Sequence, residues 1–183
     1  RAPIGTGPFD HEVPVLRILS ADGSQLRGVI FGYACHNTVL SFYEWCGDYA
    51  GFAQLSLEER HPGATALFFS GCGADQNPLP RRKVELADQY GRMLALAVEK
   101  VLPSEMSPIT GSLRTGFREI DLEFSSIPTQ EELETTAKST DRFQRTRAKL
   151  FLKDIDAGKP LSPTYPYPVQ VWKLGGVTWV ALG

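Results

Sequence analysis

The residues of this chain that could do chemistry follow two predicted buried strands. His36 comes after LRGVIFGY (26–33), and Asp75 and Asn77 come after TALFFS (65–70). Strand ends in an α/β sheet converge on one crevice, so we predict that these side chains share a pocket. An imidazole at a strand end can bind a metal ion or act as a base. Carboxylate and amide groups beside it could orient a substrate.

The glycine-rich turn before Asp75 leaves other interpretations open. Cys72 lies between Gly71 and Gly73 and could be a nucleophile on a strained turn, although a free Cys is more often a small buried residue. Backbone N–H groups of the turn could bind an anion, but the spacing is not that of a Walker loop. Asp75 to Pro78 could equally just cap the turn, and His36 could be a hydrogen-bonded core residue.

Patterns around these residues predict the elements that position them. An Asp-Gly turn joins strands 13–19 and 26–33, and Asp48 is the predicted N-cap of a short helix that ends before Pro62. Apolar residues recur at helical spacing up to Pro103, and Thr129 to Glu132 is a capping box that opens a helix toward residue 155. Strands at 112–124 and a closing hairpin with a Gly-Gly turn complete the chain. We therefore predict an α/β fold with a mixed β-sheet and flanking helices.

Charge and hydropathy argue against a nucleic-acid-binding surface and against a transmembrane helix. The formal net charge is −2, and the longest run of like charge is Arg81-Arg82-Lys83, so we expect no nucleic-acid surface. No stretch is long and apolar enough to predict a transmembrane helix. The 183 residues predict one domain, and both ends suggest truncation, because the chain starts at Arg1 and ends in the apolar VTWVALG.

Five segments, in this order and spacing, resemble the N-terminal domain of the neutral/alkaline non-lysosomal ceramidase family. They are DHEVPVLRI, FGYACHNTVL, GDYAGFA, LFFSGCGADQNP and VQVWKLGGVTWVALG. The resemblance implies that residues 1–183 are part of a catalytic domain of a zinc-dependent amide hydrolase. It also implies a small-molecule amide or lipid substrate and a secreted or extracytoplasmic location.

The family holds its zinc with two His, a Glu and a Tyr, and the resemblance assigns His36 to the second His. The other ligands would lie outside this chain. We therefore expect zinc in the full-length protein and neither zinc nor activity in this segment alone. We also predict that Gly73 and Asp48 take part in substrate binding, with Asp48 shaping the adjoining loop.

The chain departs from the family at the catalytic loop. The family has Gly-Asp-x-Ser-Pro with a catalytic Ser, whereas this chain has Ala74-Asp75-Gln76-Asn77-Pro78. An amide is no nucleophile, but it can donate a hydrogen bond to an oxyanion or carbonyl. Asn77 and Asp75 are thus the candidate catalytic residues for an amide or ester hydrolase. The alternatives are a non-catalytic binding domain with this fold and a thiol enzyme that uses Cys72.

Overall fold

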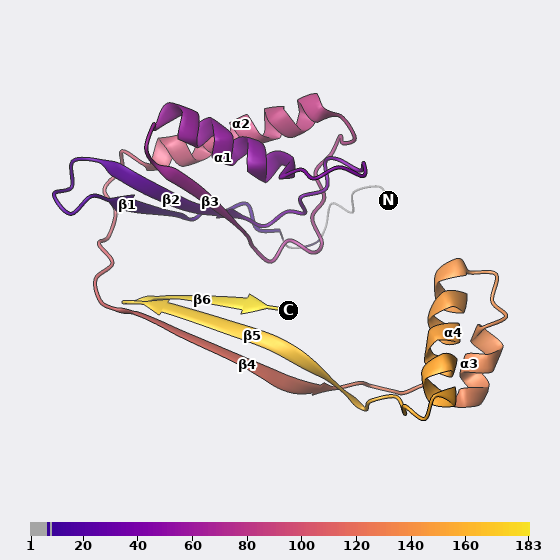
Figure 1. Ribbon diagram of the computed structural model, residues 1–183. Helices are drawn as coiled ribbons and strands as arrows, with labels where there is room; N and C mark the ends of the chain where they lie inside the picture. The colour runs from indigo at the N-terminus through magenta and orange to yellow at the C-terminus, as the bar shows by residue number, and fades with distance from the viewer. Residues whose placement is uncertain (1–6, 8) are drawn as a thin grey trace. The chain divides into compact units, whose positions relative to one another are not determined.

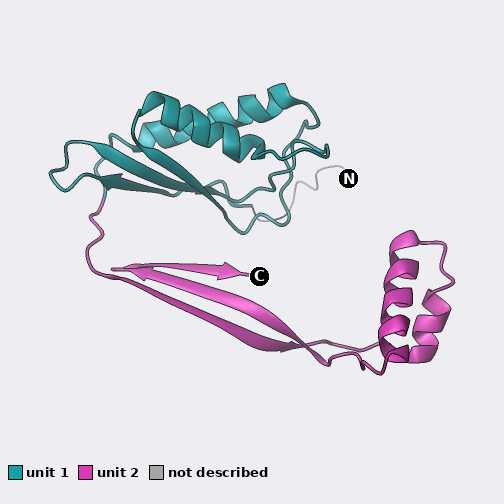
Figure 2. Cartoon of the chain, viewed as in Figure 1, with its two compact units in different colours: residues 1–106 teal, residues 107–183 magenta. Residues whose placement is uncertain are grey.

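The computed structural model describes residue 7 and residues 9–183. The chain has two compact units, unit 1 (Arg1–Met106) and unit 2 (Ser107–Gly183), which are coloured separately in Figure 2. The candidate site residues all belong to unit 1.

Unit 1 contains a three-stranded sheet in the order β1-β2-β3 (Figure 1). Strand β1 (Val15–Leu19) pairs antiparallel with β2 (Leu26–Tyr33), and β3 (Thr65–Ser70) pairs parallel with β2. The antiparallel pair turns at Gly23, whose φ of 74° is a conformation that glycine adopts without steric cost. Because β2 and β3 are parallel, their carboxyl ends lie at the same edge of the sheet, where the candidate site residues follow.

Two helices make the core of unit 1 together with the sheet. Helix α1 (Asp48–Arg60) connects β2 to β3, and α2 (Val84–Val101) follows β3. The buried residues of α2 recur at helical spacing and so form one apolar face. The largest fully buried side chains come from β2, from the loop after it and from both helices: Val29, Phe31, Val39, Leu57 and Val98.

Unit 2 is an antiparallel sheet in the order β4-β5-β6, with two helices inserted between its first two strands. Its elements are β4 (Leu113–Glu123), α3 (Gln130–Thr136), α4 (Arg142–Asp156), β5 (Thr164–Leu174) and β6 (Val177–Leu182). Leu133 and Ala148 are its buried hydrophobic residues among those described. Every residue of β4 is exposed, so this sheet has little core of its own.

The structure confirms the predicted α/β class, with a mixed sheet and helices in unit 1. The single helix expected from residue 129 to about 155 is wrong, because α3 ends at Thr136 and Asp141 caps a second helix. Its side chain accepts hydrogen bonds from the amides of Phe143 and Gln144, which satisfies two free N–H groups of the new helix. The predicted N-cap is also off by one residue, since Gly47 precedes the first turn and Asp48 lies within it.

The crossing of α1 and α2 depends on Gly91. A Cβ at this position would lie 2.5 Å from Cβ of Phe52 and 2.7 Å from the carbonyl oxygen of Tyr49. We expect Gly91→Ala to lower the free energy of unfolding by about 1–3 kcal/mol, because the two helices must separate. Gly51→Ala is the matched control in α1, where a Cβ meets no atom within 4 Å.

The control should raise the free energy of unfolding by up to about 1 kcal/mol, through better helix propensity. Urea unfolding of both variants measures the difference. Equal stability of the two would contradict the close approach of these helices.

Candidate functional site

The site is built from two loops that leave the carboxyl ends of β2 and β3 and lie against each other. The amide of His36 donates to the carbonyl of Gln76 at 3.0 Å, and the thiol of Cys35 contacts the same oxygen at 3.7 Å. At the start of the second loop, the amide of Gly71 donates to the carbonyl of Tyr33 at 3.1 Å. The loops therefore extend the pairing of β2 and β3 beyond the sheet.

Gly73 has a steric role in this pairing. A Cβ at Gly73 would collide with the carbonyl carbon of Ala34 and the nitrogen of Cys35. Both are backbone atoms, so they cannot move aside as a flexible side chain would. Glycine is required here because one backbone passes directly over the other. The structure thus gives Gly73 a packing function, and its predicted part in substrate binding stays a prediction.

The His36 ring is exposed and fixed by the second loop. Its Nε2 lies 3.0 Å from the carbonyl oxygen of Ala74. A carbonyl can only accept, so this hydrogen bond requires the proton on Nε2 and leaves Nδ1 with a free lone pair. Metal-binding imidazoles commonly donate their second ring N–H to a backbone carbonyl in this way. The ring can therefore act as a ligand or as a base through Nδ1.

Asn77 is joined to the first loop through Thr38. The Thr38 hydroxyl donates to Oδ1 of Asn77 at 3.3 Å. This bond uses the acceptor end of the amide and leaves its two N–H groups for other partners. Asp75, the neighbouring candidate, is exposed on the same loop. The structure thus brings His36 and Asn77 onto two loops that hydrogen bonds hold together.

The carboxylate of Asp48 is buried and bonded to the backbone. It accepts hydrogen bonds from the amides of Val39 at 3.1 Å, Leu40 at 2.9 Å and Tyr49 at 2.8 Å. Its backbone has a φ of 53°, in the left-handed region. This geometry fits the predicted loop-shaping role, because Asp48 holds residues 39–40 of the first loop against the start of α1. Its predicted part in substrate binding stays a prediction.

Tyr49 supports the same loop from the core. Its hydroxyl donates to the carbonyl of Cys35 at 2.7 Å, and burial raises its pKa, so it remains a donor at neutral pH. Burial also raises the pKa of the Cys35 thiol, and the nearby Asp48 carboxylate adds to this effect. Cys35 is therefore a neutral core thiol and a poor nucleophile.

A cleft of about 450 Å³ lies beside the two loops, within unit 1. Its apolar wall includes Val13 and, from α2, Met93, Leu94 and Ala97, while Asn77 and Gln76 border it from the second loop. His11 and Tyr33 add polar atoms at 3.4 Å from each other. The volume and mixed lining are typical of sites that bind small molecules.

Sequence reasoning missed the residues that join the loops, namely Thr38, Tyr49 and Gln76. Thr38 lies two residues after His36, and Gln76 lies between Asp75 and Asn77. The available sign of their role was their type and place, because they are polar and lie close to the candidates after two neighbouring strands. Cys72 is exposed and free. Among the residues described, no hydrogen bond joins it to a histidine, so the structure shows no base for the thiol-enzyme alternative.

The metal-binding side chains in the described part of this chain do not form a complete metal site. Within residue 7 and residues 9–183, no group of three or more His, Cys, Asp or Glu side chains could hold a metal ion. His36 has a suitable free nitrogen, but one imidazole does not make a zinc site. No helix in the described part of the chain is long and apolar enough to cross a membrane.

We predict that Asp48→Ala lowers the free energy of unfolding by about 3 kcal/mol. The change leaves three amides without their acceptor and places alanine at a positive φ. Asp48→Asn should cost less, because asparagine keeps one oxygen and tolerates this backbone region. Asp75→Ala, at an exposed position, is the control and should stay within about 0.5 kcal/mol of the wild type. Urea unfolding tests this, and a small effect at Asp48 would show that its carboxylate does not hold the loop.

Two solved structures share this fold. One is described as "Ceramidase complexed with C2", with a TM-score of 0.65 and 14% sequence identity, over 94% of this chain and 36% of that chain. The other is the neutral ceramidase from Pseudomonas aeruginosa, with a TM-score of 0.62 and 17% identity, over 94% of this chain and 34% of that chain. This chain thus spans about a third of the length of either structure.

No family model matches the sequence, and no curated protein matches it. At these identities the structural matches establish the fold alone. They support the resemblance noted in the sequence at that level: this chain has a ceramidase-like α/β fold.

Proposed function

We propose that this chain is part of a zinc-dependent hydrolase that acts on an amide or ester bond, with a lipid amide as substrate. One observation carries the proposal. Hydrogen bonds hold a ring with a free imidazole nitrogen and an amide with free N–H groups on adjacent loops of a ceramidase-like fold. The amide also borders an apolar cleft.

In this proposal His36 is one of the zinc ligands, through Nδ1. The carbonyl of Ala74 fixes the ring orientation and the position of its proton, as backbone carbonyls do for many metal-binding histidines. The other ligands come from parts of the full-length protein outside these residues. Bound zinc would supply Lewis acidity toward the scissile carbonyl and would lower the pKa of a water molecule.

Asn77 would contact the substrate. Thr38 holds its Oδ1, so an N–H group of Asn77 can donate to the carbonyl oxygen that becomes negative during hydrolysis. Asp75, exposed on the same loop, is the second candidate catalytic residue. The apolar cleft wall on α2 would bind the hydrocarbon part of the substrate, since burying methylene groups there is favourable.

The test uses the full-length protein and measures two quantities, bound zinc per chain and hydrolysis of N-acyl amides and esters. We expect His36→Ala to lose both. Asn77→Ala should keep its zinc and lose about a hundredfold in kcat, because it removes only a donor to the developing oxyanion. His61→Gln is the control, since His61 pairs with Glu99 at 2.7 Å, away from these loops.

Full zinc content in His36→Ala would refute the assignment of that ligand. If the wild type binds zinc but hydrolyses nothing in the panel, the non-catalytic binding domain becomes the better proposal, with Asn77 in the Ser position as its supporting feature. Rapid alkylation of Cys72 that abolishes activity would favour the thiol alternative. We also propose a secreted or extracytoplasmic location, on the strength of the resemblance alone.

A further inference from the structure

The cleft beside the two loops must also supply a proton if it hosts the amide hydrolysis proposed above. Hydrolysis adds water to the carbonyl carbon and breaks the C–N bond, whose electron pair goes to the nitrogen. An amine anion is too basic to leave, so the nitrogen must receive a proton as the bond breaks. Asn77 would act on the carbonyl oxygen, and no residue has yet been assigned to the nitrogen. The proton donor should be another side chain of the cleft.

The cleft is lined by five side chains that can carry a transferable proton, namely His11, Tyr33, Cys35, Tyr49 and Tyr90. The hydroxyl of Tyr49 donates to the carbonyl of Cys35 at 2.7 Å, and that of Tyr90 donates to the carbonyl of Pro80 at 2.8 Å. The thiol of Cys35 contacts the carbonyl of Gln76 at 3.7 Å. Backbone carbonyls thus engage three members of this set, and the first two remain.

His11 and Tyr33 contact each other. Nδ1 of His11 lies 3.4 Å from the hydroxyl oxygen of Tyr33. Burial raises the pKa of that hydroxyl, so Tyr33 keeps its proton at neutral pH. A neutral phenol can donate to Nδ1 or accept from it, so the contact can form in both charge states of the ring. The contact leaves Nε2 of His11 as the nitrogen that can give a proton to a bound molecule.

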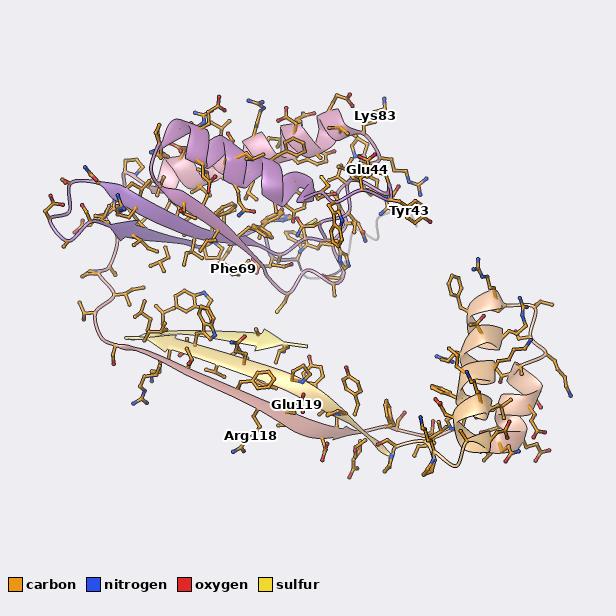
Figure 3. All side chains as sticks on the ribbon, in the orientation of Figure 1. Tyr43, Glu44, Phe69, Lys83, Arg118 and Glu119 are labelled. Atoms are coloured by element: carbon orange, nitrogen blue, oxygen red, sulfur yellow. The ribbon has the colours of Figure 1, made fainter. Side chains whose placement is uncertain are left out.

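Tyr33 lies on the face of the unit 1 sheet that the helices cover. Its neighbour Gly32 pairs with Phe69 in β3, and Figure 3 shows Phe69 on the face of the sheet away from α1 and α2. Paired residues share a face, and successive residues of a strand point to opposite faces. Tyr33 therefore points to the helix side, where Met93 and Leu94 of α2 line the cleft.

Two contacts hold the segment that carries His11. The side-chain amide of Gln76 donates to the carbonyl of Asp10 at 3.3 Å, and the ring of Phe9 lies against that of His11, with the ring centroids 4.5 Å apart. Because Gln76 directly precedes Asn77, the segment is attached beside the residue proposed to contact the substrate carbonyl. The oxygen and nitrogen of an amide are bonded to the same carbon, so donors to these two atoms must lie close together.

We propose that His11 is the general acid of this hydrolysis and that Tyr33 positions its ring. The imidazolium gives the proton on Nε2 to the nitrogen as the C–N bond breaks, and the amine leaves uncharged. The attacking water gives up a proton to solvent, and the exposed ring of His11 regains one from solvent. The products are the carboxylic acid and the amine. This inference rests on the proposed function and adds the residue that acts on the leaving group.

The experiment compares two substrates of the full-length protein that share one acyl group. One is an N-alkyl amide, whose amine needs a proton to leave, and the other is a p-nitrophenyl ester, whose p-nitrophenolate leaves without one. We expect His11→Gln to lose about a hundredfold in kcat on the amide and less than about threefold on the ester, because glutamine can donate a hydrogen bond but cannot transfer a proton. Tyr33→Phe should lose about tenfold on the amide alone, because it removes only the group that positions the ring.

His61→Gln is the matched control. His61 pairs with Glu99 at 2.7 Å and does not line the cleft, so this variant should hydrolyse both substrates as the wild type does. Bound zinc per chain is measured on every variant. We expect His11→Gln to keep the zinc content of the wild type, which separates its role from that of His36.

Three results would overturn the inference. An amide rate in His11→Gln equal to that of the wild type would leave the proposed function standing without this general acid. An equal loss on both substrates, or a loss of zinc, would show that His11 only supports the site. If the wild type hydrolyses neither substrate, the proposed function itself fails, and the role of His11 fails with it.

Discussion

The site depends on the close approach of two backbones, at Gly73 over the peptide bond between Ala34 and Cys35. Only a residue without a Cβ lets the second loop come this near the first. Once the backbones are in contact, the amide of His36 reaches the carbonyl of Gln76, and the ring of His36 reaches Ala74. The position of His36 therefore follows from a steric constraint at Gly73 to which its own side chain does not contribute.

Buried polar groups of the core stabilise the contact between the two loops. The Asp48 carboxylate and the Tyr49 hydroxyl satisfy backbone groups of the first loop, which has no strand or helix of its own to do so. Both residues come from the first turn of α1, a helix that crosses α2 closely at Gly91. The first loop, α1 and its crossing with α2 thus form one connected support for the site.

Sequence patterns predicted much of the fold but few of the contacts within the site. The Asp-Gly turn, the parallel strands either side of a helix and the capping box at Thr129 are local signals that the structure bears out. The sequence analysis predicted one helix where the structure has α3 and α4. Helical spacing alone does not show that Asp141 caps the start of a second helix. Sequence predicted that His36, Asp75 and Asn77 follow neighbouring strands and share a pocket; all three follow β2 or β3, but of the three only Asn77 lines the cleft. The hydrogen bonds between the two loops depend on contacts between residues far apart in the sequence.

Amide hydrogen exchange at His36 tests the central claim most directly. The residue is exposed and lies outside every strand, so its amide would exchange freely unless the second loop accepts its hydrogen bond. We expect exchange slowed by about a hundredfold or more in the wild type, and loss of that protection in Gly73→Ala while Val29 and Phe31 in β2 stay protected. Free exchange at His36 in the native protein, or protection that survives Gly73→Ala, would contradict the account.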